Sequence, residues 1–268
     1  MNPVSKTAYY CCAVRALDAR TVSPVCGDIF AERFMTPEAW QTFEPFRDFR
    51  EPNASNVARH RMIDDILRAR LAARPETGVV ILGAGFDTRP FRLAGGRWVE
   101  LDDPAVISLK EARLPAREAP NPLTRVPLQF GREPLAAALA RFGDLVEPIV
   151  VVEGVLPYLT EGEMSALVRA VRTAWPTPTL VCDLISRTFA RRYGGKIGQR
   201  LRELGAPYRP SDHEPLPLIE AAGFRLETRE SVVGYAAARG TIRVPRWLLS
   251  TLLRSLRDGY AIATFRSV

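Results

Sequence analysis

Two short segments of this chain carry residues that suit a nucleotide. Residues 78–85 (GVVILGAG) join an apolar run to Gly83, Ala84 and Gly85, and glycines let the backbone approach a ligand closely. Residues 98–101 form a second mainly apolar segment, which ends in Asp102. A glycine loop followed by a carboxylate that can take both ribose hydroxyls is typical of nucleotide sites.

One missing glycine indicates the size of the ligand. The dinucleotide fingerprint requires a third glycine at position 88, and this chain has Thr88 there. A pyrophosphate on the helix N-terminus is therefore disfavoured, and we predict a smaller ligand such as S-adenosylmethionine. The alternative for Asp102 is that it caps the next helix, but we assign that role to its neighbour Asp103.

Three further side chains are candidates for chemistry. Glu153 directly follows an apolar strand, and a buried carboxylate there requires a cationic or donor partner. Tyr158 either faces the methyl acceptor or packs under the following helix. His213 is the leading candidate for a general base if the acceptor is a phenol, whereas we expect His60 to be structural.

Several longer blocks of the sequence resemble the leucine carboxyl methyltransferase family, which includes the polyketide-type O-methyltransferases. The resemblance runs from about Thr7 to at least Thr160. The matching blocks are residues 83–89 (GAGFDTR), 91–93 (FRL), 100–104 (ELDDP) with Lys110, 153–159 (EGVLPYL), and Thr7-Ala8 with Arg15-Ala16.

The resemblance implies a class I methyltransferase that binds S-adenosylmethionine without a metal. It places the methionine end of the cofactor near Gly83 and near an arginine matched by Arg59, and it assigns Glu153 to the cofactor. The family carries an aspartate near the adenine, where this chain has Gln129. The amide oxygen of Gln129 can still accept a hydrogen bond from the adenine amino group, but it carries no charge.

The best-known acceptors in the family are carboxylates, which are ionised at neutral pH and need no general base. The sequence fits this chemistry, because no Ser-His-Asp or Cys-His arrangement is apparent in it. We therefore predict an O-methyltransferase that esterifies a small, anionic secondary metabolite. The alternatives are a phenol or enol O-methyltransferase, a protein C-terminal carboxyl methyltransferase, and a non-catalytic S-adenosylmethionine binder.

The elements that position these residues alternate between strand and helix. We expect strands at 79–82, 98–101, 124–128, 148–152, 180–184, 224–233 and 260–265. We expect helices at 54–73 with Asn53 as its cap, 104–113, 133–142, 161–174, 216–222 and 244–256. This order predicts a doubly wound, Rossmann-like α/β fold with a mostly parallel seven-stranded sheet, which binds ligands at the carboxyl ends of its strands.

The chain is predicted to form a helical N-terminal lid at 1–75 and a methyltransferase core at 76–268. Within the lid we expect helical segments at 7–20, 25–34 and 37–49. A basic, glycine-rich segment at about 186–215 is expected to cover the substrate as a cap.

Bulk composition excludes several other classes of protein. The net charge of +7 comes from 34 arginines and three lysines, which are scattered rather than arranged in a basic stripe, so we expect no nucleic-acid partner. No run of about eighteen apolar residues is present, so we expect no membrane span. The N-terminus does not look like a secretion signal and the four cysteines lack metal-binding spacing, which favours a reducing cytoplasm. The sequence leaves the oligomeric state open.

Overall fold

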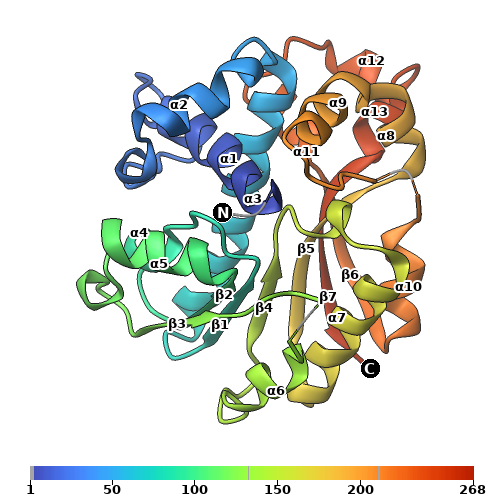
Figure 1. The fold of residues 1–268 in the computed structure, drawn as a ribbon. Helices are drawn as coiled ribbons and strands as arrows, with labels where there is room; N and C mark the ends of the chain where they lie inside the picture. The colour runs from blue at the N-terminus through green and yellow to red at the C-terminus, as the bar shows by residue number, and fades with distance from the viewer. Residues whose placement is uncertain (1–2, 132, 211) are drawn as a thin grey trace.

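The computed structural model describes residues 3–131, 133–210 and 212–268. Its centre is a seven-stranded sheet in the order β3-β2-β1-β4-β5-β7-β6 (Figure 1). The strands are β1 (Gly78–Leu82), β2 (Arg97–Asp102), β3 (Leu123–Pro127), β4 (Ile149–Val152), β5 (Thr179–Ile185), β6 (Phe224–Ser231) and β7 (Tyr260–Ser267). Neighbouring strands from β3 to β5 are parallel, and β7 is antiparallel to β5 and β6. The predicted mostly parallel α/β fold is confirmed.

Helices cover both faces of the sheet. Val80 and Leu82 belong to the core shared with α6 (Leu135–Ala140), α7 (Glu161–Ala174) and α10 (Pro215–Ala221). Val79 and Ile81 point to the opposite face, into the core shared with α3 (Arg50–Ala73) and α11 (Val232–Ala238). Burial on both faces explains why β1 and β4 appear in the sequence as unbroken apolar runs.

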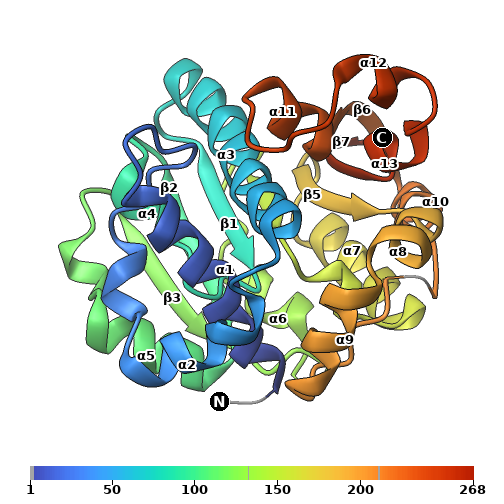
Figure 2. The ribbon, with the colours of Figure 1, turned by 90° about the horizontal axis from the view of Figure 1, so that it is seen from above.

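The remaining helices gather mostly around the ends of the strands. Figure 2 shows α1 and α3 over the half of the sheet that holds β1 and β2, with α8 and α9 on the other side. These remaining elements are α1 (Pro3–Ala19), η1 (Ala31–Phe34), α2 (Pro37–Phe43), η2 (Glu44–Phe46), α4 (Arg89–Arg92), α5 (Pro104–Arg113), η3 (Ala116–Glu118), η4 (Leu156–Tyr158), α8 (Arg187–Tyr193), α9 (Gly195–Glu203), α12 (Arg246–Ser250) and α13 (Arg254–Asp258).

Two helix starts follow directly from local sequence. Asp103 caps α5, because its carboxylate accepts from the backbone N–H of Ala105 at 2.9 Å. A capping box of Thr160 and Glu163 begins α7. The assignment of Asp103 as a helix cap is therefore confirmed.

The predicted helical segment at 25–34 is wrong except for its last turn. The Asp18 carboxylate accepts from the backbone N–H groups of Val25, Cys26 and Gly27 at 2.8, 2.9 and 3.0 Å. Gly27 also has a φ of +62°, which a right-handed helix does not contain. These contacts hold the segment as a loop, and helical structure begins only at η1.

Asn53 does not cap α3, because the helix begins earlier, at Arg50. The Asn53 amide instead donates to the carbonyl oxygen of Phe46 at 3.0 Å. The side chain thus ties the first turn of α3 back to η2.

Two predictions near the C-terminus are also wrong. β6 ends at Ser231 rather than continuing to 233, because the Ser231 hydroxyl accepts from the Gly234 N–H at 2.9 Å and begins α11. The expected helix at 244–256 is two short helices, α12 and α13, separated where Thr251 has φ −120° and ψ −92°.

The division into a lid at 1–75 and a core at 76–268 stays a prediction. Within the first segment, Ile63, Leu67 and Leu71 of α3 already pack against the sheet. The predicted cap at about 186–215 contains α8 and α9, and its residue 211 lies outside the described residues. Among the helices that the structure describes, none combines the length and apolar character that a bilayer crossing requires.

Candidate active site

A cavity of about 1050 Å³ lies above the carboxyl ends of β1, β2, β4 and β5. This volume reaches the upper end of the range for small-molecule sites, so it has room for a cofactor and a second molecule. Its wall brings together eight of the nine predicted site residues, namely Arg59, Gly83, Ala84, Gly85, Asp102, Gln129, Glu153 and Tyr158.

The glycine loop after β1 is shaped by its neighbours. Gly83 and Gly85 have φ angles of +70° and +47°, which favour glycine. A Cβ on Gly83 would lie 2.4 Å from a methyl carbon of Val155, in the loop after β4. The backbone N–H groups of Gly83 and Ala84 also donate to the Leu101 carbonyl at 2.9 and 3.1 Å. The glycine loop therefore fits closely against the end of β2 and the loop after β4.

Asp102 is held by neutral donors. Its two carboxylate oxygens accept from the N–H groups of Gly85 and Asp103, each at 2.6 Å, and it forms no ion pair with any described residue. Burial raises the pKa of Asp102 to about 6, against the opposing effects of the two amides and of Lys110. A carboxylate without a cation at the cavity wall fits a ribose diol, which offers two hydroxyl donors.

Glu100 lies two residues earlier on the same strand and has a different environment. It is fully buried, with carboxylate oxygens 2.8 Å from Lys110 Nζ and 3.0 Å from Arg125 Nε. These ion pairs tie β2 to α5 and β3. Of the two acids, only Asp102 lines the cavity.

Arg59 of α3 connects the ends of three strands. Its Nε donates to Glu153 Oε1 at 2.9 Å, and its Nη1 donates to Asp183 Oδ2 at 3.3 Å and to the Tyr260 hydroxyl at 3.1 Å. Asp183 Oδ1 accepts from the N–H of Gly154 at 2.7 Å. The buried guanidinium is thus held between the loop after β4, the end of β5 and the start of β7.

Glu153 has two further partners. Its Oε2 lies 2.8 Å from Arg89 Nη2 and 3.2 Å from His60 Nδ1. Burial alone would raise the pKa of Glu153, but Arg89, His60 and Arg59 together hold it well below the usual value. The prediction that Glu153 meets a cationic partner is confirmed, and the cations come from the protein itself.

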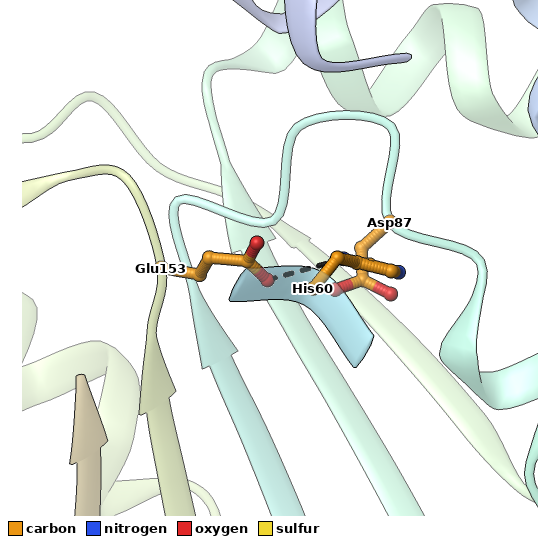
Figure 3. Close-up of side chains that lie close together, drawn as sticks. All are labelled: His60, Asp87 and Glu153. Atoms are coloured by element: carbon orange, nitrogen blue, oxygen red, sulfur yellow. Dashed lines mark hydrogen bonds and ion pairs between the residues drawn. The ribbon is translucent and has the colours of Figure 1, made fainter. Parts of the chain in front are cut away.

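His60, Asp87 and Glu153 come together from three elements in Figure 3, with possible ligand atoms within 4.8 Å of one another. Such a group could hold a metal ion. In this structure the Arg89 guanidinium contacts all three, at 2.8 Å from both Glu153 Oε2 and His60 Nδ1 and in a short ion pair with Asp87. The guanidinium thus supplies the positive charge that the two carboxylates require.

The same network extends outward to the first helix. Asp64 pairs with Arg89 at 2.6 Å and with Arg92 at 2.7 Å. Arg15 of α1 pairs with Asp28 at 2.9 Å and donates to the Phe86 carbonyl at 2.7 Å. These buried ion pairs fix α1 and α3 against the loop after β1.

Sequence reasoning missed three residues of this site, Arg89, Asp183 and Tyr260. Asp183 could have been predicted from the sequence. It is a lone acid inside the apolar strand at 179–185 (TLVCDLI), and such a buried acid requires a partner, as Glu153 does. Arg89 and Tyr260 carry no such signal, since their roles depend on contacts that are distant in sequence.

Tyr158 and Gln129 both lie where a ligand can reach them. Tyr158 belongs to η4, and its ring packs edge-on against Tyr208 at 5.4 Å between centroids. Gln129 follows β3, and its backbone N–H donates to Glu133 at 3.2 Å.

His213 is the one predicted site residue that does not line the cavity. It is buried beside a separate small hollow that it shares with Leu156, Pro157 and Pro215. Because Pro157 lines both spaces, η4 lies between His213 and the large cavity.

Comparisons with known proteins agree with this geometry. Residues 8–172 match the family model described as leucine carboxyl methyltransferase. The tetracenomycin polyketide synthesis O-methyltransferase TcmP of Streptomyces glaucescens is 26% identical over 252 residues, covering 92% of this chain and 90% of that protein. A Frankia alni protein whose name gives it as an S-adenosyl-L-methionine-dependent methyltransferase is 32% identical, covering 73% of this chain and 79% of its own length.

A solved structure of a DUF574 family protein from Streptomyces avermitilis shares the fold. It has a TM-score of 0.62 at 14% identity, and the match covers 94% of this chain and 100% of that one. The family match spans the loops after β1 and β2 and strand β4, which Glu153 directly follows. The chain therefore belongs to the leucine carboxyl methyltransferase family and is an S-adenosylmethionine-dependent methyltransferase.

Proposed function

We propose that this enzyme transfers the methyl group to a carboxylate oxygen of a small acidic molecule and forms a methyl ester. When bound, S-adenosylmethionine supplies a methyl group on a positively charged sulfur. The carboxylate oxygen forms the new bond to that carbon as the bond to sulfur breaks, so the negative and positive charges are lost together. The protein has to hold the acceptor in line and exclude water.

The observation that carries this proposal is that four largely buried acidic and histidine side chains at the cavity wall are already paired with arginines. Asp87, Glu153, Asp183 and His60 each hold an ion pair or hydrogen bond with Arg59 or Arg89. None of these four is therefore free to remove a proton. A phenol requires such a base, whereas an ionised carboxylate does not.

For the cofactor we propose a set of residues at the end of the cavity beside the glycine loop. Asp102 would take the ribose hydroxyls beside the loop of Gly83, Ala84 and Gly85. Arg59 would meet the carboxylate of the methionine end, since its Nη2 has one distant partner, the Cys11 sulfur at 3.7 Å.

Two more residues complete this proposed cofactor site. Glu153, which the surrounding cations keep ionised, would favour the ammonium group of the methionine end. Gln129 would accept from the adenine amino group. The name of TcmP, an O-methyltransferase of polyketide synthesis, supports an oxygen acceptor on a small molecule.

A labelling experiment tests the proposal. The enzyme is incubated with methyl-labelled S-adenosylmethionine and small-molecule extracts, and the labelled product is then treated with mild alkali. Release of labelled methanol is expected, because esters are cleaved under these conditions and aryl ethers are not. An alkali-stable product would assign the enzyme to the phenol or enol class. Cofactor binding without any labelled product would favour a non-catalytic binder.

A further inference from the structure

Five tyrosines line the cavity. The hydroxyl of one, Tyr193 of α8, forms a hydrogen bond with the Ser255 hydroxyl at 3.1 Å, and the other four come from separate elements. Tyr10 comes from α1, Tyr158 from η4, Tyr208 from the loop after α9 and Tyr260 from the start of β7. They are distant in sequence, and the fold brings all four to the wall of one cavity, with Tyr260 in contact with Arg59. We call them the tyrosine cluster.

The rings of the tyrosine cluster are fixed by packing. Tyr10 lies 4.7 Å from Phe46 and 6.4 Å from Phe43 between ring centroids. Tyr158 and Tyr208 pack edge to face at 5.4 Å. Hydroxyl groups on rings held in this way point in defined directions.

Three of the four hydroxyl protons have no acceptor among the described residues. Thr7 acts on the Tyr158 hydroxyl and lowers its pKa. The hydroxyls of Tyr10 and Tyr208 form no hydrogen bond with any described residue, although both side chains line the cavity. The Tyr260 oxygen accepts from Arg59 Nη1 at 3.1 Å, so its proton points elsewhere.

The tyrosine cluster supplies neutral donors. Burial raises the pKa of all four phenols above the ordinary value, and the Arg59 charge acts on each of them in the opposite direction. The phenols therefore remain protonated at neutral pH. Groups of this kind donate hydrogen bonds and do not act as bases.

We propose that Tyr10, Tyr208 and Tyr260 form the recognition site for the carboxylate of the methyl acceptor, so that neutral hydroxyls rather than a free cation bind this anion. The inference rests on the proposed function, because it assumes a carboxylate acceptor. Arg59 pairs with Glu153 and Asp183, and its remaining donor is assigned above to the methionine end of the cofactor, so it is not available to the acceptor.

The chemistry of transfer favours neutral donors. The acceptor loses its negative charge as the new bond forms, so attraction to a free cation would be strongest before the reaction and would raise the barrier. Neutral hydroxyl donors orient the carboxylate oxygens of the acceptor, and their interaction energy changes less between the bound acceptor and the transition state than that of a cation. The rival site is at the exposed edge of the cavity, where Arg192 and Lys196 offer cations.

The test uses 1-naphthoate as the probe and the protein saturated with S-adenosylhomocysteine. Calorimetry or ligand-observed NMR gives the Kd for 1-naphthoate and for its neutral analogue 1-naphthamide. We expect Tyr10→Phe and Tyr208→Phe each to weaken naphthoate binding about tenfold, as expected for a hydrogen bond to a charged group. Naphthamide binding should change less, and the affinity for S-adenosylhomocysteine should stay unchanged, which also shows that each variant is folded.

Tyr9→Phe is the matched control. Tyr9 neighbours Tyr10 on α1, but it packs against Phe86 at 4.8 Å and does not line the cavity. This variant should bind naphthoate as the unmodified protein does. Equal effects of Tyr9→Phe and Tyr10→Phe would overturn the assignment.

Three other outcomes would overturn it as well. They are unchanged naphthoate binding in the Tyr10 and Tyr208 variants, a larger loss in Lys196→Ala than in either of them, and no naphthoate binding to the loaded unmodified protein. Failure of the proposed function looks different, since it would appear as an alkali-stable labelled product or as no labelled product at all.

Discussion

The two ends of the cavity are built from different kinds of side chain. The cofactor end is surrounded by buried ion pairs, in which Arg15, Arg59, Arg89 and Arg92 are each matched by acids. The tyrosine cluster meets this network where Tyr260 contacts Arg59. Towards the cap, the cavity is lined by Tyr208 and apolar side chains, and the cations Arg192 and Lys196 lie at the exposed edge. Under the proposed assignment, fixed charge is concentrated where the permanently charged cofactor would be held, and neutral donors would face the anion whose charge disappears in the reaction.

The difference also has a folding consequence. A buried charge is tolerated when it is paired and hydrogen-bonded, and the ion pairs at the cofactor end join α1, α3 and α4 to the loops after β1 and β4. The cap end carries no comparable network among the described residues. We therefore expect substitutions at the two ends to have different effects on stability and on ligand binding.

The largest effect should come from breaking the network at its centre. Arg89→Ala removes the partner of Asp64, Asp87 and Glu153 at a fully buried position. We expect a loss of about 3–5 kcal/mol in the free energy of unfolding, as is typical when one member of a buried ion pair is removed. Urea unfolding without cofactor measures it.

The control for this prediction is an exposed arginine. Arg47 pairs with Glu44 at 2.8 Å on the surface, and Arg47→Ala should change stability little. Wild-type stability of Arg89→Ala would show that the network does not hold the cofactor end together.

A smaller effect should separate the two adjacent acids after β2. Asp102→Asn should weaken binding of S-adenosylhomocysteine by about 1.5–3 kcal/mol, the range for hydrogen bonds to a charged group. Asp103→Ala should cost about 1 kcal/mol of stability as a lost helix cap, with little change in cofactor affinity. Equal losses of affinity would mean that the ribose contact is assigned to the wrong acid.

The pH dependence of cofactor affinity should follow Asp102. Its pKa of about 6 without cofactor means that the carboxylate is ionised at pH 7 and takes up a proton as the pH falls. Binding through the ionised form therefore has to displace that proton below pH 6, and affinity should fall by up to about tenfold for each further pH unit. Titrations at pH 7, 6 and 5 measure this, and Asp102→Asn should show a flat profile.

A still smaller effect, on kcat, is expected from substitution of His213, which lies outside the cavity. Because no proton has to leave a carboxylate acceptor, His213→Gln should keep kcat within a few-fold at saturating cofactor. A loss of about 10²-fold or more, as is typical when a general base is removed, would place a base at the cap end after all. The kcat of His213→Gln is measured by steady-state kinetics with the acceptor identified in the labelling experiment.

No effect is expected from metal removal. His60, Asp87 and Glu153 already share the guanidinium of Arg89, so excess chelator should leave the calorimetric titration of S-adenosylmethionine unchanged. Loss of binding that divalent metal restores would show that the cofactor end needs a metal.

The parts of this molecule that the sequence predicts well are those with a local physical cause. The apolar runs ending at Leu82 and Val152, the glycines at 83 and 85 and the cap at Asp103 each follow from neighbouring residues. Parallel strands then bring their carboxyl ends together, which is why Asp102 and Glu153 were expected at one site.

What the sequence does not predict depends on contacts between distant segments. The Asp18 carboxylate stops a helix at 25–34 by binding three backbone N–H groups, and nothing in the local pattern shows this. The position of His213 depends on how η4 and the chain beyond α9 pack. Histidine is a suitable residue type for a base, but His213 lines the small hollow beside Pro157 and not the large cavity. Of the tyrosine cluster, only Tyr158 was predicted as a site residue, and Tyr10, Tyr208 and Tyr260 were missed for the same reason.

The contact between Gly83 and Val155 has a consequence for recombining related enzymes. A methyl carbon of Val155 lies 2.4 Å from where a Cβ on Gly83 would be, so the loops after β1 and β4 are shaped against each other although they are far apart in the gene. A chimera that takes one loop from a relative and keeps the other would set a foreign side chain against this glycine. Crossover points in such libraries should therefore keep the two loops in the same parental segment.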